Sequence, residues 1–571
     1  MSHIRRRPSL LGGLLWTGLG VLFLLHNFSI GPNLWSMAGR YWPILLILLG
    51  LGKVIDYYRQ KEGVSIRLGE VVGILILLFV GSIITKVSGS HFGRVISEIP
   101  IEIGGASVQP GRWIGTSYSY SQEASYPVTV GTALRVENSY GQVLVSPGGE
   151  GEVRVRLRKV VFHNEEAKAK SIADEIKLEA GLESRGEAEA PPVKPEAEPA
   201  PKGKAAPVFV VRTNRESLSA KDYRFNTELE VFVPKQSQVA VRNQYGEVRA
   251  INLEGKLDLS TTHNPLEVHD CTGDVLISNR YSDSRILNLR GNATVDTRGK
   301  VYVETIKGDL VVHDEYASVE IRDVDGKVSV SNTDSSVSID KVSKPVVVDG
   351  QGCQVTVRAL SDSLRVNTSH KRVNISDVAA NVNLDSRYAN VTLKDIKGNV
   401  DIASNSDHIN LDDIRGYLKV KADGSGVQAN GVTGAVEITT TRKDVNVNNF
   451  SSSCKIFNEY GDVTLSTGSK IKGELNVKNR NGDIQLFLPE SAGFQIDATA
   501  RNGRVDSDFA GLEPAVSSSA VGTLKGRIKD GGAKIVLDTE YSNIHIRTRE
   551  GESDNSPGRD EPKKRHGRGE I

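Results

Sequence analysis

The feature that most constrains this chain is an 18-residue repeat that begins at Gln238 and ends at residue 452. It recurs as twelve consecutive units, one of them 17 residues long, and a representative unit is DLVVHDEYASVEIRDVDG. Positions 2, 4, 11, 13 and 16 are nearly always apolar. The alternation at 2/4 and at 11/13 indicates two short strands with one buried face each, and position 16 indicates an inward residue at a corner.

One unit cannot bury its apolar face alone, so the units must stack on one another. We therefore predict an all-β fold, a parallel β-solenoid of 18-residue two-strand rungs, whose handedness the sequence leaves open. A β-propeller is the main alternative, but its blades need about 40–50 residues. Position 18 is often glycine, as at Gly273 and Gly416, which predicts a tight turn with positive φ.

A second motif, Asn-x-Tyr-Gly-x-Val, begins at Asn138, Asn243 and Asn458 and occupies positions 6, 8, 9 and 11 of the unit. We expect its Asn and Gly to shape the turn between the two strands. We expect the tyrosines at position 8 to stack between neighbouring rungs, and an aromatic ligand-binding stripe is the alternative interpretation. The same position carries Tyr281, Tyr316 and Tyr388.

The copy at Asn138 predicts a strand pair ahead of the array, and irregular segments after residue 452 predict distorted capping rungs. After the first strand pair, NEEAKAKSIADEIKLEAGL is a helix candidate with Asn164 as its N-cap. The predicted parts are a transmembrane region at 1–90, initial strands plus one helix at 91–180, a Pro/Ala/Glu-rich loop at 181–207, the β-solenoid at 208–550 (regular rungs 238–452, irregular capping rungs 453–550) and a disordered polar tail at 551–571.

Three apolar runs near the N-terminus predict an α-helical transmembrane region of about three spans. The first extends from Leu10 to Phe28, and two shorter runs begin at Tyr41 and Val71. Positive charges precede the first run and separate the second from the third, so the positive-inside rule places the large C-terminal domain outside the cytoplasm. Two alternatives stay open. In one, the first run is a cleaved signal peptide rather than a membrane span. In the other, the third run does not cross the membrane, which would leave the large domain in the cytoplasm.

The charge balance, 71 Lys and Arg against 70 Asp and Glu, argues against a nucleic-acid binder. Cys271, Cys353 and Cys454 fall on rungs far from one another. A disulfide needs Cα atoms within about 7 Å, so we predict three unpaired cysteines.

Aspartate is frequent at position 15, where it occurs as Asp270, Asp323, Asp377, Asp395 and Asp413. The last three lie in successive rungs. Such a ladder could bind calcium, but an Asp at a turn more often hydrogen-bonds its own backbone. The histidines are scattered, and no G-x-S-x-G, P-loop or H-E-x-x-H motif occurs. We predict no catalytic, cofactor-binding or metal-binding residues and no cofactor. The rival class is a polysaccharide-acting β-helix enzyme, which needs acids and bases clustered on one face.

The segments LRVENSYGQVLV and ELEVFVPKQSQVAVRNQYGEVRAINLEG, with the repeats that follow, resemble the toastrack-type, adhesin-like β-strand-repeat family over about residues 130–550. At the N-terminal end, GGLLWTGLGVLFLLHNF and YWPILLILLGLG resemble the transmembrane pair of Lia-type bacterial envelope-stress proteins. The resemblance implies a bacterial membrane protein with an extracytoplasmic solenoid and no catalytic residues. Related proteins are linked to envelope-stress sensing or to surface adhesion.

These features together predict a non-enzymatic, multi-pass protein of the bacterial cytoplasmic membrane, whose solenoid is a binding or scaffold surface in cell-envelope stress sensing. A cell-surface adhesin or glycan-binding protein is the alternative. The expected partners are the membrane, through the N-terminal helices, and an envelope protein or a cell-wall or surface glycan. Nucleic acid and a small-molecule substrate are not expected.

Overall fold

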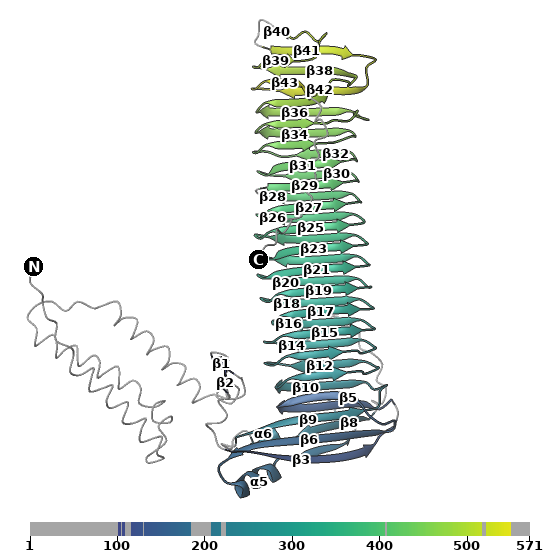
Figure 1. Cartoon of the computed structure of the whole chain (residues 1–571), viewed down its shortest axis with the longest axis vertical. Helices are drawn as coiled ribbons and strands as arrows, with labels where there is room; N and C mark the ends of the chain where they lie inside the picture. The colour runs from purple at the N-terminus through teal and green to yellow at the C-terminus, as the bar shows by residue number, and fades with distance from the viewer. Residues whose placement is uncertain are drawn as a thin grey trace, which may run out of the picture. The chain divides into compact units, whose positions relative to one another are not determined.

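The computed structural model describes residues 101–103, 106–108, 116–129, 131–183, 207–218, 224–405, 408–516 and 521–549. These residues form two compact units. The smaller unit includes an antiparallel pairing of β1 (Ile101–Ile103) with β2 (Ala106–Val108). The larger unit is a column of stacked strands (Figure 1).

Each rung of the column contributes one strand to each of two sheets, here called sheet I and sheet II. The strands of sheet I are β4 (Ala133–Tyr140), β7 (Leu178–Glu183), β8 (Val208–Thr213), β10 (Val239–Tyr245), β12 (Leu257–Thr261), β14 (Val275–Asn279), β16 (Ala293–Thr297), β18 (Leu310–Glu315), β20 (Val328–Thr333), β22 (Val346–Gln351), β24 (Leu364–Ser369), β26 (Val382–Arg387), β28 (Val400–Asn405), β30 (Leu418–Ala422), β32 (Val436–Thr439), β34 (Cys454–Tyr460), β36 (Leu475–Asn481), β38 (Phe494–Arg501), β40 (Ala515–Val516), β41 (Val521–Ile528) and β42 (Ala533–Thr539).

The strands of sheet II are β3 (Thr116–Pro127), β5 (Gln142–Pro147), β6 (Glu152–His163), β9 (Phe225–Val233), β11 (Val248–Ile251), β13 (Leu266–His269), β15 (Ser284–Leu289), β17 (Val301–Ile306), β19 (Val319–Val324), β21 (Ser336–Val342), β23 (Gln354–Leu360), β25 (Val373–Val378), β27 (Val391–Ile396), β29 (His408–Ile414), β31 (Gly426–Val432), β33 (Val445–Asn448), β35 (Val463–Ser466), β37 (Ile484–Pro489), β39 (Val505–Ser507) and β43 (Ile544–Arg549). From β10 to β35, successive rungs pair in parallel and in register, as Val239 does with Leu257. The predicted parallel β-solenoid is confirmed.

The core of the column lies between the two sheets. Val239 and Val241 on β10, and Val248 and Ala250 on β11, are buried, whereas the residues between them are more exposed. Position 16 is buried in every unit from Leu253 to Phe450, as predicted for an inward corner residue. Because each rung shares this pattern with its neighbours, stacking joins the apolar faces into one continuous core.

The corner at position 15 has a left-handed backbone in all twelve units, with φ between 52° and 72°. Asn and Asp adopt this conformation more readily than other residues with a side chain, and they occupy eight of the twelve positions. The aspartates at position 15 are therefore explained by backbone geometry.

The predicted positive φ at position 18 holds for Gly255, Gly273, Gly291 and Gly308 only, and a second constraint applies to the glycines without it. Gly273 has a φ of +120°, but Gly416 is not among the positive-φ residues. At both positions a Cβ atom would lie 2.3 Å from the carbonyl oxygen of the position-18 glycine in the preceding rung, Gly255 or Gly398. Close approach between stacked rungs is the constraint common to these glycines.

At the N-terminal end, the order of rungs in space differs from their order in the chain. Strand β4 lies between β8 and β10, because Leu134 pairs with Phe209 on one side and with Val239 on the other. Strand β5 lies between β9 and β11 in the same way. The strand pair predicted ahead of the array is thus inserted into it, and β7 pairs antiparallel with β8 beyond it.

The C-terminal end repeats this arrangement. Strand β42 lies between β36 and β38, where Ile535 pairs with both Leu475 and Ile496. Strand β43 lies between β37 and β39, where Ile544 pairs with Ile484 and Val505. The capping rungs predicted after residue 452 exist, but the last one in the chain is enclosed, and β41 covers β38 as an antiparallel strand.

The helix candidate is only partly correct. Helix α5 (Glu166–Glu175) begins two residues after the predicted N-cap, Asn164, and the end of the candidate segment forms β7 (Leu178–Glu183). A second short helix is α6 (Arg215–Leu218). Neither helix, nor any other among the residues with described positions, is long and apolar enough to cross a bilayer. The three apolar runs, the Pro/Ala/Glu-rich loop (apart from residues 181–183 and 207) and the polar tail lie outside these residues.

Candidate functional site

The turn between the two strands of each rung is held by a ladder of buried polar side chains at position 6. Its members include Asn243, Thr261, Asn279, Thr297, Asp314, Asn332, Thr368, Ser386, Ser404 and Thr440. Asn243 Nδ2 donates to the carbonyl oxygen of Gly246 in its own turn (2.9 Å) and to that of Gly141 in the adjacent rung (3.0 Å). Asn458 also bonds its own turn. The expectation that this Asn shapes the turn is confirmed.

One member of this ladder is ionisable. Asp314 is almost fully buried, and its Oδ2 accepts hydrogen bonds from Asn332 Nδ2 (2.6 Å) and from the Ala317 amide (3.1 Å). Burial raises the pKa of Asp314 from 3.8 to about 7. The site lies inside the turn, so it affects stability rather than ligand binding.

Aromatic side chains at position 8 stack over the first rungs, as predicted. The rings of Tyr140 and Tyr245 lie 4.9 Å apart, Tyr245 and His263 4.6 Å, and His263 and Tyr281 5.1 Å. The next rung has Gly299 at the equivalent position, so the stack stops there. Stacking between rungs accounts for this cluster, and the aromatic positions do not form one continuous stripe.

The aspartates of position 15 bond to neighbouring corners. Asp270 Oδ1 accepts from Asn288 Nδ2 at 2.9 Å, and Asp323 Oδ2 accepts from Thr305 Oγ1 at 3.3 Å. Over the described part of the chain, no group of three or more His, Cys, Asp or Glu residues is placed to hold a metal ion. The corner geometry therefore favours a structural role for these carboxylates.

The three cysteines are free and buried, as predicted. Cys271 and Cys454 occupy apolar core positions, and burial raises the pKa of both thiols. Thiols protonated in this way are poor nucleophiles, so they are not candidate reaction centres.

The outer face of sheet I is hollowed across β20, β22, β24, β26 and β28. Three adjoining hollows lie there, and the one nearest the turn has a volume of about 600 Å³. The first two share Arg365, Asn383 and Asp401, and the second and third share Asn367. We call this continuous surface the sheet I groove. Its lining also includes Ser331, Thr333, Val347, Asp349, Gln351, Ser369, His370, Asp385, Arg387, Tyr388 and Ala403.

The charged side chains of the sheet I groove are not neutralised by one another. Within the described residues, Arg365, Asp385 and Asp401 have no hydrogen-bond or ion-pair partner, although all three are exposed. Nearer the N-terminus, on the same face, Arg242 instead donates two hydrogen bonds to the Asp258 carboxylate, at 2.9 and 2.6 Å. Unpaired charges, amides and hydroxyls make the groove a candidate surface for an external ligand.

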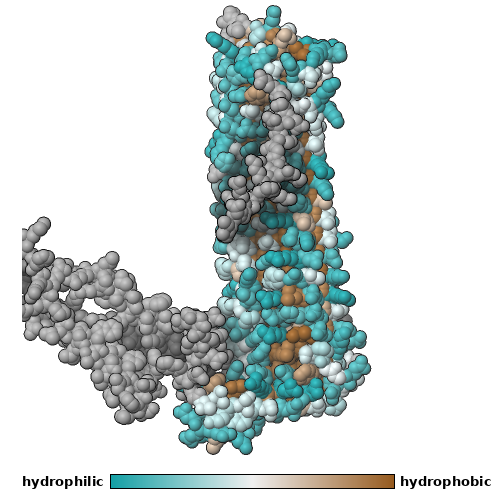
Figure 2. All heavy atoms as spheres, viewed as in Figure 1, coloured by the Kyte–Doolittle hydropathy of each residue, from teal (hydrophilic) through white to brown (hydrophobic). Residues whose placement is uncertain are grey.

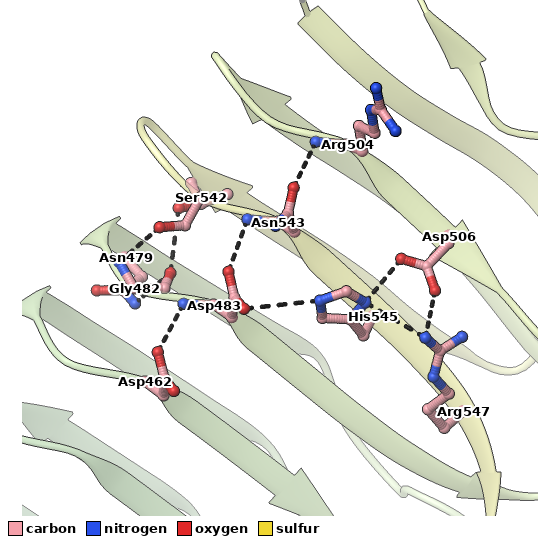
Figure 3. Close-up of polar contacts among 11 residues, drawn as sticks. Asp462, Asn479, Gly482, Asp483, Arg504, Asp506, Ser542, Asn543, His545 and Arg547 are labelled. Carbon is pink, nitrogen blue, oxygen red and sulfur yellow. Dashed lines mark hydrogen bonds and ion pairs between the residues drawn. The ribbon is translucent and has the colours of Figure 1, made fainter.

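A second polar cluster lies on sheet II, where the last rung is enclosed (Figure 3). His545 on β43 lies between Asp506 on β39 and Asp483 at the start of β37, with nitrogen–oxygen distances of 2.7 and 3.7 Å. Arg547 pairs with Asp506 at 2.5 Å and with Asp508 at 3.0 Å. Asp483 Oδ1 also accepts a hydrogen bond from the backbone N–H of Asn543 at 2.9 Å.

This cluster connects three rungs that are not consecutive in the chain. Asp483 and Asp506 flank His545 because β43 is inserted between β37 and β39. The sequence interpretation missed the cluster, since its residues fall in irregular rungs whose order the repeat does not specify. Its carboxylates already form ion pairs and hydrogen bonds with neighbouring residues, so the cluster connects the inserted rung to the rungs on either side of it.

Residues 354–547 match the family described as Toastrack DUF4097, and residues 10–54 match the LiaI-LiaF-like transmembrane region. No curated protein is significantly similar to the chain. A crystal structure from Clostridium sporogenes ATCC 15579, described as a "putative cell adhesion protein", aligns with 75% of this chain and 100% of its own at 8% identity. Its TM-score is 0.12, so it does not bear on the fold.

The family matches fall on the segments that carry the resemblance seen in the sequence. The first covers the solenoid from β23 to β43, and the second covers the first apolar run and most of the next. Together they fit a membrane-associated envelope protein. Residues 354–547, within the stacked β-strand repeats, are thus similar to the toastrack family, and residues 10–54 are similar to the LiaI–LiaF transmembrane region.

Proposed function

We propose that this chain is a non-enzymatic, membrane-anchored envelope protein whose extracytoplasmic solenoid is a binding and scaffold surface in cell-envelope stress sensing. The observation that carries the proposal is the sheet I groove, whose exposed side chains, among them Arg365 and Asp385, lack partners within the described chain. The match to a LiaI–LiaF-like transmembrane region supports the membrane anchor. The proposed topology places three apolar runs in the bilayer and the solenoid outside.

In-cell crosslinking tests this function. A photo-crosslinking residue is placed at Arg365 or Asn383 on sheet I, and at Asn374 or Thr392 on the outer face of sheet II. Capture of a discrete membrane protein from at least one of these positions, with or without polysaccharide, is the expected result for a sensor or scaffold. Capture of heterogeneous surface polysaccharide alone would favour the second candidate, a surface adhesin. Capture of cytoplasmic proteins only would overturn the proposed topology.

A polysaccharide-acting enzyme is the third candidate, and the cluster of Asp483, Asp506 and His545 is the observation in its favour. A glycosidase needs one carboxylic acid to protonate the leaving group and a second carboxylate to act as nucleophile or base. Here both oxygens of Asp506 face partners, His545 and Arg547, which argues for a structural role. Release of reducing ends from envelope polysaccharide, abolished by His545→Ala in a folded protein, would revive the enzyme.

A further inference from the structure

We propose that the sheet I groove binds an uncharged, hydroxyl-rich glycan strand lying along the solenoid axis. This inference rests on the proposed binding function and names the ligand class. The groove crosses five successive strands of sheet I, from β20 to β28. Parallel strands lie about 4.8 Å apart, so equivalent side chains recur at this step along the axis. A linear polymer can contact such a row repeatedly.

The backbone of the groove floor leaves no place for an added peptide strand. Strands β22, β24 and β26 each pair with a neighbour on both sides. Peptide binding by strand addition needs an exposed sheet edge, which this surface lacks. Recognition in the groove therefore depends on side chains.

The lining is also unlike the centre of a protein–protein interface. Such centres are rich in apolar and aromatic residues and poor in charged ones. In the groove, Pro345, Val347 and Ala403 are the apolar outward side chains and Tyr388 and Tyr417 the tyrosines, and most of the other outward side chains are amides, hydroxyls and charged groups. Figure 2 shows hydrophilic residues over most of one face of the column, with small hydrophobic spots between them. Amides and hydroxyls both donate and accept hydrogen bonds, which matches the hydroxyl groups of sugars.

The charges of the groove argue for a neutral ligand. Arg365 and Arg387 oppose Asp349, Asp385 and Asp401, so neither sign dominates. A polyanion would gain from the two arginines but would be repelled by three carboxylates. A neutral strand can bond to both kinds of group without this cost.

An aromatic ring stands at the turn end of the groove. The side chain of Tyr388 is 68% exposed, and its ring lies 5.4 Å from that of His370 in the preceding rung. Both residues line the hollow. An exposed ring with an apolar face and a polar tip can pack against the C–H face of a sugar while its hydroxyl bonds to water or ligand.

The test is a binding titration of the purified full-length chain with cellohexaose and chitohexaose, two neutral hexasaccharides, and with hexagalacturonate as an anionic counterpart. We expect saturable binding of at least one neutral hexasaccharide, at least tenfold tighter than hexagalacturonate. Arg365→Ala and Tyr388→Ala should each weaken it about tenfold. Thr356→Ala, at an outward position of sheet II, is the matched control and should leave it unchanged.

Three results would overturn the inference: no saturable binding of either neutral hexasaccharide, equal affinity in the groove variants and the control, or tighter binding of the polyanion. Thermal unfolding of each variant shows whether the fold is intact. If the sugars fail to bind while crosslinking in cells still captures a membrane protein, the glycan assignment falls and the proposed envelope function stands. If crosslinking captures only cytoplasmic proteins, the envelope function falls regardless of sugar binding.

Discussion

The central array and the two ends of the solenoid are built from the same rung but assembled differently. From β10 to β35, each rung follows its predecessor both in the chain and in space. At each end, a strand pair distant in the chain is enclosed between two others, as β42 is between β36 and β38. Contacts in the centre are therefore local, whereas the ends are closed by pairings over longer separations.

This difference shows how a solenoid can protect its open edges. A strand at the end of a stack exposes unpaired backbone groups that can pair with other chains. Here the enclosed rungs are followed outward by antiparallel strands, β7 at one end and β41 at the other. At each end, the terminal strand is therefore covered by a segment that does not follow the 18-residue period.

The largest expected effect comes from removing the enclosed C-terminal rung. Truncation after residue 530 deletes β42 and β43, whose core residues Ile535, Leu537, Ile544 and Ile546 are fully buried. Losing four such side chains costs roughly 6–12 kcal/mol. Hydrogen exchange should then show β36 and β38 opening while the central array stays protected.

A matched deletion sharpens this comparison. Removing residues 381–398 takes out one complete central rung, β26 and β27, and joins two rungs of the same register. This variant should keep a protected, cooperatively folded column, because each rung contacts only its neighbours. If this deletion disrupts β36 to β38 as severely as the truncation does, the distinction between centre and ends is wrong.

The next effect concerns a single buried carboxyl in the central array. Burial raises the pKa of Asp314 from 3.8 to about 7, so its contribution to stability is complete below pH 3.8 and is lost as the pH rises through about 7. Asn279 and Asn332 occupy the equivalent position in other rungs, so Asp314→Asn introduces a residue already used there. At pH 8 this substitution should raise the free energy of unfolding by an amount on the order of 2–4 kcal/mol. Denaturant unfolding at pH 5 and pH 8 measures it. Identical slopes against pH in the two proteins would contradict the assignment.

A smaller loss is expected where two rungs come closest. In Gly416→Ala, the new Cβ would lie 2.3 Å from the Gly398 carbonyl oxygen, so stability should fall by about 1–3 kcal/mol. The control lies at the N-terminal end, where a Cβ at Gly181 meets nothing within 4 Å. Chemical denaturation should show no loss for Gly181→Ala. Equal losses in both variants would mean that rung contact is not the cause.

The smallest effect separates paired from unpaired surface charges. Arg242→Ala removes the two charged hydrogen bonds to the Asp258 carboxylate and should lower the free energy of unfolding by up to about 1 kcal/mol, less at high salt. Arg365→Ala in the sheet I groove should leave the free energy of unfolding unchanged, since that side chain has no described partner. A stability loss for Arg365→Ala would show that the arginine serves the fold rather than a ligand.

Much of the central array could be predicted from the sequence, because burial alternates with a fixed local period. Val239, Val248 and Leu253 show the inward positions directly, and the separation of the cysteines follows from the rung count. The left-handed corner at position 15 also had a signal, the frequent Asp there, although the pattern alone indicated turn hydrogen bonding, with calcium binding as the alternative, rather than the backbone conformation. The sequence signal for the sheet I groove was weaker. The 18-residue period identifies which residues point outward, but not which of them form ion pairs or hydrogen bonds with one another.

The sequence by itself determined the rung, its two strands, its inward faces and its turn chemistry, since these depend on residues within 18 positions of one another. Only the tertiary structure decided the order of the terminal rungs, the meeting of His545 with Asp483 and Asp506, and the hollow on sheet I. The physical reason is that many strands here share one alternating apolar pattern, so each could pair with several others. Which of these alternative strand pairings forms depends on the packing of the whole stack, and no single segment of the sequence determines that packing.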